Sequence, residues 1–396
     1  MATTRANHTK ITKLPIFNDD RDLVKFLETS FTETAKQYIK ALVTTMLKAE
    51  MEDFRQKAQA DMPFNGYYPR QLVSPFGRVE DIPVPRFRSA PDGLDLRSMQ
   101  LFESEQQRTM DLLADMHLNG MSQRKLKDLA HKHLGLNWGT KRIGACFRQL
   151  VEQEEFQINS QALDDEYEFL YCDGIWETVK GYGWDSNKAV VLCVLGAKPD
   201  GTRKMLGFAM ARAEDHEAWT TLLSGIKARG LSGRNLRLVT SDDSGGLKKA
   251  LDQVFSKVKL QLCIVHKMRD VLGKTSHKHK PALGEDLKLV YEARTKEDAT
   301  TAAQALVKKW YTKEEEACAS LRHNFELTLT YLDFPPELWS KIRSNNAVER
   351  EFREVRRRTK TFDNSFNDER SLNRYHNGVL TWLNDNYPRK GIHNNG

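Results

Sequence analysis

The first residue in this sequence that suggests chemistry is Asp173, an aspartate inside an apolar stretch. Residues 169–176 read FLYCDGIW, a composition typical of a buried strand. An ionised carboxylate in such a strand is costly unless a cation or a hydrogen-bond network meets it. Two interpretations remain open: an aspartate that accepts backbone hydrogen bonds, or a metal ligand that needs partners elsewhere in the chain.

Two further acids are candidates for those partners. Asp242 comes just after an apolar strand-like segment, where a side chain would lie at the edge of a sheet. Glu349 lies on a predicted helix whose apolar stripe is Val348, Phe352 and Val355. The neighbouring stripe of that helix consists of Glu349, Arg353, Arg356 and Lys360. This stripe has two interpretations. The acid could face a metal while the cations follow a nucleic-acid backbone, or the stripe could be a solvated face held by a Glu–Arg pair worth about 0.3 kcal/mol.

The elements around these acids predict an α/β fold. Three short β-prone segments separated by turn residues, at 169–176, 188–195 and 204–210, predict an antiparallel meander. The next predicted elements are a helix, a strand, a helix and a strand, at residues 215–229, 236–240, 247–255 and 258–264. Ligands of such a layout are expected at the strand ends.

The chain before the first strand divides into three predicted parts. Residues 1–62 are expected to be an N-terminal helical segment, and residues 63–98 a hairpin-like module in which Arg and Tyr alternate with turn residues. Residues 99–165 give three helical signals with a glycine turn at Gly120, compatible with a helix-turn-helix-like DNA-binding domain. A solvated loop and a three-helix bundle without DNA affinity fit the same residues.

After the last predicted strand the β signals stop. Residues 166–266 are therefore expected to form the first part of a core, residues 267–340 an all-helical insertion, and residues 341–396 the final helices of that core.

The composition favours a reduced, water-soluble protein with a polyanionic partner. The formal net charge is +7 over 396 residues, and the five cysteines are scattered. No apolar run reaches the roughly 18 residues of a membrane helix, and the N-terminus lacks the apolar core of a signal peptide. We expect a cytoplasmic protein with no membrane partner.

Taken together, the motifs resemble the IS256 family of bacterial DDE transposases, which is related to the Mutator-like elements. The matching segments are 171–174 (YCDG), 241–243 (SDD), 263–266 (CIVH), 344–349 (SNNAVE) and 356–360 (RRRTK), with 65–70, 84–88 and 120–122 upstream. The likeness covers about residues 40–385. It departs from the family pattern at Asp243, where a glycine is usual, and at Ser344 and Asn345, where threonines are usual. The first departure leaves the choice between Asp242 and Asp243 open.

The resemblance implies an RNase H-like catalytic core interrupted by the helical insertion. It implies that Asp173, Asp242 and Glu349 are the catalytic residues and hold two Mg²⁺ or Mn²⁺ ions about 4 Å apart, and that Cys263 and His266 support the active site. The implied activity is nicking of the inverted-repeat ends of a transposon, followed by strand transfer of the freed 3′-OH, by a copy-out-paste-in route. The implied partners are double-stranded DNA and a second copy of the chain.

Cations along the chain are expected to contact DNA phosphates. They are Arg70, Arg86, Arg88, Arg124, Lys125, Lys141, Arg142, Lys267, Arg269, Arg353, Arg356, Arg357, Arg358 and Lys360.

Three alternatives remain at this point. Cys263 and His266 form a C-x2-H-x10-H-x-H pattern with His277 and His279, an unusual spacing for a zinc site. The chain could also be a transposase-derived, sequence-specific DNA-binding protein without catalysis. A structure-specific nuclease with the same core is the third alternative.

Overall fold

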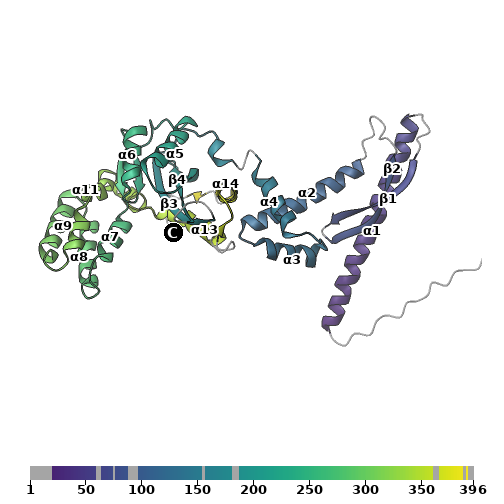
Figure 1. Cartoon of the computed structure of the whole chain (residues 1–396), viewed down its shortest axis with the longest axis horizontal. Helices are drawn as coiled ribbons and strands as arrows, with labels where there is room; N and C mark the ends of the chain where they lie inside the picture. The colour runs from purple at the N-terminus through teal and green to yellow at the C-terminus, as the bar shows by residue number, and fades with distance from the viewer. Residues whose placement is uncertain are drawn as a thin grey trace, which may run out of the picture. The chain divides into compact units, whose positions relative to one another are not determined.

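The computed structural model describes residues 20–58, 64–74, 76–87, 97–153, 157–180, 187–359, 365–386 and 389–390. The chain divides into two compact units (Figure 1). The N-terminal unit comprises residues 1–113 and 123–143, and the C-terminal unit comprises residues 114–122 and 144–396.

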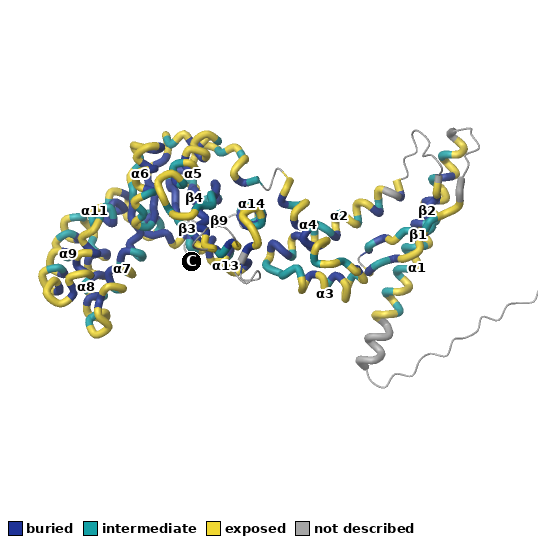
Figure 2. Tube along the Cα trace, viewed as in Figure 1, coloured by how far each residue is buried: buried dark blue, intermediate teal, exposed yellow. Residues whose placement is uncertain are grey.

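A long helix and a hairpin form the core of the N-terminal unit. Helix α1 (Asp20–Ala58) packs beside strands β1 (Phe64–Ser74) and β2 (Gly77–Phe87), which pair antiparallel. The buried stripe of α1 is narrow, because Val43, Leu47 and Met51 are buried whereas Leu42 and Met46 are exposed. Figure 2 shows buried, intermediate and exposed positions mixed along this helix. The buried stripe meets hairpin residues Leu72, Val79, Ile82 and Val84.

Three helices follow where the sequence predicts three. They are α2 (Arg97–Leu118), α3 (Gln123–Leu134) and α4 (Thr140–Val151). The predicted end of α2 is confirmed: Gly120 has φ +94°, and the Met121 N–H donates to the carbonyl of Met116 at 3.1 Å. This six-residue closure with a left-handed glycine is a Schellman helix end.

A mixed sheet lies at the centre of the C-terminal unit. Its main strands are β3 (Phe169–Val179), β4 (Lys188–Ala197), β5 (Thr202–Ala211), β6 (Leu238–Ser241) and β7 (Lys259–Leu262), in the order β7-β6-β3-β4-β5. The predicted meander is confirmed, because β4 pairs antiparallel with β3 and β5. Strands β6 and β7 continue the sheet in parallel to β3. Two-residue strands β8 (Ser365–Phe366) and β9 (Arg389–Lys390) pair with β3 and β5.

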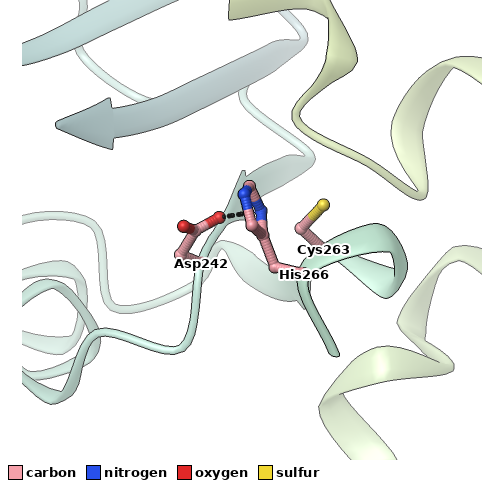
Figure 3. Close-up of side chains that lie close together, drawn as sticks. All are labelled: Asp242, Cys263 and His266. Atoms are coloured by element: carbon pink, nitrogen blue, oxygen red, sulfur yellow. Dashed lines mark ion pairs between the residues drawn. The ribbon is translucent and has the colours of Figure 1, made fainter. Parts of the chain in front are cut away.

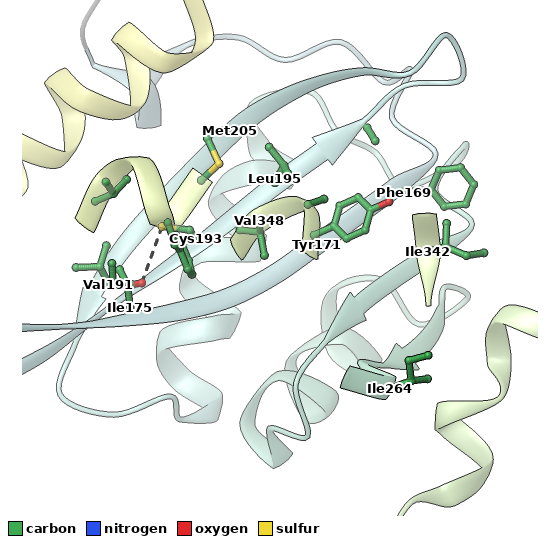
Figure 4. Packing of buried hydrophobic residues seen from close by; sticks show 14 of the residues in the cluster. Phe169, Tyr171, Ile175, Val191, Cys193, Leu195, Met205, Ile264, Ile342 and Val348 are labelled. Atoms are coloured by element: carbon green, nitrogen blue, oxygen red, sulfur yellow. Dashed lines mark hydrogen bonds between the residues drawn. The ribbon is translucent and has the colours of Figure 1, made fainter. Parts of the chain in front are cut away.

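Helices cover both faces of this sheet because successive strand residues point to opposite sides. Leu170 and Cys172 pack with helices α5 (His216–Ala228) and α6 (Gly245–Val254). Phe169, Tyr171 and Ile175 belong to the opposite core, with α13 (Asn346–Thr359) and α14 (Glu369–Asn386). Figure 4 shows Val348 of α13 over this second face. The sheet is thus buried on both sides, as its near-continuous apolar strands require.

Residues 267–340, all of which the structure describes, contain no strand. Their helices begin with α7 (Ile264–Gly273) and continue through α8 (Lys280–Glu292), α9 (Lys296–Trp310), α10 (Glu315–Arg322), α11 (Phe325–Thr328) and α12 (Pro336–Ile342). Most of them lie together beside the sheet (Figure 1). Thr295 caps α9 by accepting a hydrogen bond from the Asp298 N–H at 3.1 Å.

Helix α14 contains a buried histidine whose protonation should destabilise the fold. His376 is fully buried, its Nδ1 lies 3.0 Å from the Leu372 carbonyl, and burial lowers its pKa from 6.5 to about 4. Because the unfolded chain binds the proton more readily, the stabilisation from neutral His376 is complete above pH 6.5 and is lost as the pH falls toward 4. Between pH 7.5 and pH 5, the free energy of unfolding in denaturant titrations should fall by about 2 kcal/mol more in the unmodified protein than in His376→Gln. Equal pH dependence in the two proteins would contradict this origin.

Candidate active site

The parallel ladders bring the predicted acids to one level of the sheet. Cys172 of β3 pairs with Ser241 of β6, which pairs with Leu262 of β7. The residues that directly follow these three in the chain are Asp173, Asp242 and Cys263. Strands β6 and β7 end here, so Asp242 and Cys263 lie at the carboxyl edge of the sheet, the expected position for ligand-binding side chains.

His266 joins this edge to the late helix. It lies in the first turn of α7, and its Nδ1 is 2.5 Å from Oδ1 of Asp242. Its Nε2 is 3.2 Å from Oε1 of Glu349, in the first turn of α13. The two carboxylates therefore meet opposite edges of one imidazole ring. Figure 3 shows this ring beside Asp242, with the Cys263 thiol on its other side.

The ionisation of these groups follows from their contacts. The Asp242 carboxylate and the Cys263 thiol raise the pKa of His266 to about 10, so its ring is a cation at neutral pH. Burial, and then the charge of Asp242, raise the pKa of Asp173 to about 7 although the Gly174 N–H and His266 oppose this shift. Negative charge is thus concentrated here, and the protonated His266 neutralises only part of it.

Asn345 fixes the position of Asp242, a role that the sequence did not reveal. Its buried Nδ2 donates to the Cys172 carbonyl at 3.1 Å and to Oδ1 of Asp242 at 3.3 Å. Its N–H donates to Sγ of Cys263 at 3.3 Å, and its carbonyl accepts from the Glu349 N–H at 3.0 Å. One asparagine, placed where the family pattern has a threonine, therefore ties together β3, the residues that follow β6 and β7, and α13.

The neighbouring aspartate points elsewhere. Oδ1 of Asp243 accepts from Asn324 Nδ2 at 2.8 Å, and its Oδ2 lies 3.3 Å from Lys267 Nζ. These partners belong to the helical insertion and to α7, whereas Asp242 contacts His266. The geometry favours Asp242 as the second acid of the site.

A fourth acid, Glu214, adjoins the site from the segment before α5. A Cβ built on Gly174 would lie 2.6 Å from Oε1 of Glu214 and 2.8 Å from Cγ2 of Val190, so a larger residue at this position requires one of these side chains to shift. Burial, with a contribution from Asp242, raises the pKa of Glu214. No sequence motif had marked this residue.

Lys267 requires a correction, because it was predicted to contact phosphates. Its side chain is buried, and Nζ donates to the carbonyls of His323 at 2.8 Å and Ser320 at 3.3 Å as well as to Asp243. The ammonium group is therefore occupied within the fold, where it links α7 to the end of α10.

Replacing this buried ammonium should affect stability rather than DNA binding. Lys267→Met would leave two carbonyls and a carboxylate without their cation, so the free energy of unfolding should fall by about 3 kcal/mol in denaturant titrations. Arg269→Ala, at an exposed position of the same helix, is the matched control and should leave stability unchanged. An unchanged unfolding midpoint for Lys267→Met, combined with a shallower salt dependence of DNA binding, would restore Lys267 as a phosphate contact.

Arg358 requires the same correction. It is fully buried, its Nε donates to the Leu118 carbonyl at 2.8 Å, and its Nη1 donates to Oε2 of Glu354 at 2.7 Å. The guanidinium also lies 4.8 Å from the centre of the Trp382 ring. A side chain held on three sides in this way cannot reach DNA.

The other predicted phosphate contacts differ in exposure. Exposed side chains belong to Arg86, Arg124, Lys125, Lys141, Arg142, Arg269, Arg353, Arg356 and Arg357. Arg70 is half-buried with its guanidinium 5.1 Å from the Phe102 ring centre. Arg357 is 3.0 Å from Glu354. Arg88 and Lys360 lie outside the described residues.

The four residues of the alternative zinc pattern do not lie close enough together to share one metal ion. Nδ1 of His279 lies 2.6 Å from Glu314, and the His279 ring lies 5.2 Å from that of Trp310. Among the described residues, the group with metal-ligand spacing is Asp242, Cys263 and His266, whose ligand atoms lie within 4.8 Å of one another. Neither His277 nor His279 belongs to it.

Comparison with known proteins places the chain, with its mixed α/β core and acids at neighbouring strand ends, among nucleic-acid-processing enzymes. The particular family follows from the same comparison: the chain belongs to the Mutator family of transposases. The model of this family, described as "Transposase, Mutator family", matches residues 8–390.

Several insertion-sequence transposases are similar to the chain over most of their length. The transposase of ISRM5 from Rhizobium meliloti (strain 1021) is 28% identical over 342 residues, covering 85% of this chain and 84% of the relative. The transposase of IS256 in transposon Tn4001 from Staphylococcus aureus is 29% identical over 328 residues, covering 82% and 81%. The transposase of IS905 from Lactococcus lactis is 24% identical over 355 residues, covering 90% and 88%.

In the described part of the chain, no helix combines the length and the apolar character needed to span a membrane.

Proposed function

We propose that this chain is a DDE transposase that binds the inverted-repeat ends of its element and nicks them by metal-dependent phosphodiester hydrolysis. The freed 3′-OH is then joined to target DNA by strand transfer, along a copy-out-paste-in route. The observation that carries the proposal is the convergence of Asp242 and Glu349 on His266, with Asp173 on the strand next to Asp242. Residues far apart in the sequence thereby form one acidic site.

The sheet topology supports an RNase H-like core. An antiparallel meander continued by two parallel strands, with helices on both faces, places Asp173 on the central strand and Asp242 at the end of its neighbour. In the proposed domain division, this core comprises residues 166–266 and 341–396 and is interrupted by the helical insertion 267–340. Residues 1–62, 63–98 and 99–165 precede it, and the last of these is the proposed helix-turn-helix-like DNA-binding domain.

The donor set fits a hard divalent cation. Carboxylate oxygens are the ligands that Mg²⁺ and Mn²⁺ prefer, and Asp173, Asp242 and Glu349 supply them. The raised pKa of Asp173 and the protonated ring of His266 indicate that the site attracts positive charge. When bound, two such ions activate the attacking water and stabilise the leaving 3′ oxygen.

The protein's own residues position these ligands. His266 holds Asp242 at Nδ1 and Glu349 at Nε2, so the two acids stay aimed at a common point. Asn345 prevents rotation of Asp242 by donating to its Oδ1. Cys263 accepts a hydrogen bond from the Asn345 N–H and thereby helps to hold Asn345 in place. Such preorganisation matters because a small displacement of reacting groups is costly in rate.

Double-stranded DNA is the proposed substrate, as both transposon ends and target. A homodimer is proposed because two ends must be brought together, and the cytoplasm with its nucleoid is the proposed location. The exposed cations Arg124, Lys125, Lys141 and Arg142 of α3 and α4 support a DNA-facing role.

A cleavage and joining assay tests this function. The inverted repeats that flank the gene supply a labelled duplex, which is incubated with the protein, Mg²⁺ and a target plasmid. Nicks at the end of the repeat and covalent joining to the plasmid are the expected products. Tight binding without any nick, even with Mn²⁺, would identify a DNA-binding protein without catalysis. Cutting of unrelated duplexes without joining would identify a nuclease.

A further inference from the structure

A large cavity lies within the helical insertion, outside the acidic site. Its volume is about 860 Å³, and it is lined by residues of α9, α10 and α11, and by Lys248 of α6. Pockets that bind small organic groups measure about 300–1,000 Å³. The cavity therefore has room for more than ordered water.

The rim of the cavity is basic. Lys248, Lys308 and Arg322 line it, against a single acid, Glu326. Lys248 and Lys308 are exposed, and the Arg322 guanidinium lies 5.8 Å from the Tyr311 ring centre. None of the three cations forms a salt bridge with any residue that the structure describes. Their charges are thus available to an anionic ligand.

The floor of the cavity is apolar and includes an aromatic ring. Val307, Leu321 and Phe325 line it together with Ala303 and Leu327. Phe325 and Val307 are partly buried, so one face of each contacts the core while another faces the cavity. An apolar, aromatic floor under a cationic rim matches a nucleobase with its phosphate, since bases stack on aromatic side chains and phosphates pair with cations.

The cavity adjoins the acidic site through one side chain. Asn324 lines the cavity and donates from Nδ2 to Oδ1 of Asp243 at 2.8 Å. Asp243 directly follows Asp242, and Lys248 lies in the first turn of α6 that begins two residues later. A DNA strand with its cleaved phosphodiester at Asp242 would therefore bring a nearby nucleotide to the cavity.

We propose that this cavity binds an unpaired nucleotide of the DNA strand, with its base on the Phe325 side and its phosphate at Lys248 and Lys308. This proposal rests on the proposed function, which puts the cleaved phosphodiester bond at the acidic site beside the cavity. The ligand it commits to is single-stranded DNA, whose bases are free to leave the stack.

A binding experiment without metal tests the proposal separately from catalysis. In EDTA, fluorescence anisotropy measures the affinity of the full chain for a labelled 12-nucleotide oligothymidylate and for a 24-base-pair duplex of unrelated sequence. Gln304 is an exposed residue of the cavity wall, so Gln304→Trp fills the cavity, while Ala305→Trp places the same bulk on an exposed position outside it. We expect Gln304→Trp to weaken oligothymidylate binding about tenfold and duplex binding less than twofold, and Ala305→Trp to change neither.

The cations are tested by salt dependence. The double variant Lys248→Ala, Lys308→Ala should reduce the slope of log K against log salt concentration for single-stranded DNA by about 1.4. Lys249 is exposed on the same helix as Lys248 but lies outside the cavity, so Lys249→Ala is the control for the loss of one surface charge. Unchanged oligothymidylate affinity in Gln304→Trp would overturn the proposal. Competition by free thymidine monophosphate as strong as by the oligonucleotide would also overturn it, in favour of a small-molecule site. Loss of cleavage in active-site variants affects neither outcome.

Discussion

Replacing any one of Asp173, Asp242 and Glu349 by its amide should abolish nicking of the element's ends while binding of those ends persists. Each change keeps the shape of the side chain but removes a charged oxygen ligand, which costs several kcal/mol of transition-state stabilisation. Because each 1.36 kcal/mol is a factor of ten, the nicking rate should fall at least about 1,000-fold. Single-turnover cleavage of a labelled end with Mg²⁺, together with a gel-shift measurement of binding, gives both quantities.

Asp243→Asn is the matched control, because this acid neighbours Asp242 but faces Asn324 and Lys267. It should keep the nicking rate within about tenfold, since its carboxylate contacts no atom of His266 or Glu349 among the described groups. Full activity in any of the three amide variants would remove that acid from the catalytic set. Loss of activity only in Asp243→Asn would reverse the choice between the adjacent aspartates.

Arg358→Ala should destabilise the C-terminal unit by about 3–5 kcal/mol, although the residue belongs to the basic run that resembles a DNA-binding segment. The change removes a buried cation, leaves the Leu118 carbonyl and Glu354 without their partner, and opens a void beside Trp382. The melting temperature should fall by on the order of 10 °C. Differential scanning calorimetry measures it directly.

Arg357→Ala is the control at the adjacent position. Its side chain is exposed, and its pairing with Glu354 at 3.0 Å is a surface contact worth at most about 1 kcal/mol. Its melting temperature should stay within a few degrees of the unmodified protein, with any effect appearing in the salt dependence of DNA binding. Equal melting temperatures for Arg358→Ala and the unmodified chain would show that Arg358 leaves its buried position.

The sequence predicted the sheet well because its signals are local. Alternating or continuous apolar runs identified all five main strands, and the helix predicted at residues 215–229 is α5, whose Trp219, Leu222, Leu223 and Ile226 are buried. Local strand and helix patterns marked the three acids as candidates, and the family resemblance gave them their expected roles. Their convergence depends on strand register and on the start of α13, which composition cannot give.

The cations were the least predictable part of the site. Lys267 and Arg358 look like surface charges in the sequence, because basic residues are seldom fully buried. Only the fold supplies the carbonyls and carboxylates that make burial of their charges tolerable. Asn345 was overlooked for the opposite reason: an uncharged amide gives no chemical signal until its hydrogen bonds to the Cys172 carbonyl and Asp242 are seen.

Manganese anomalous diffraction from crystals of the protein bound to an uncleaved DNA end tests the central claim most directly. The account predicts Mn²⁺ within about 2.5 Å of carboxylate oxygens of Asp173 and Asp242, and a second Mn²⁺ ligated by Glu349 after its separation from His266. Manganese absent from these carboxylates, with Glu349 still paired to His266 beside bound DNA, would contradict it.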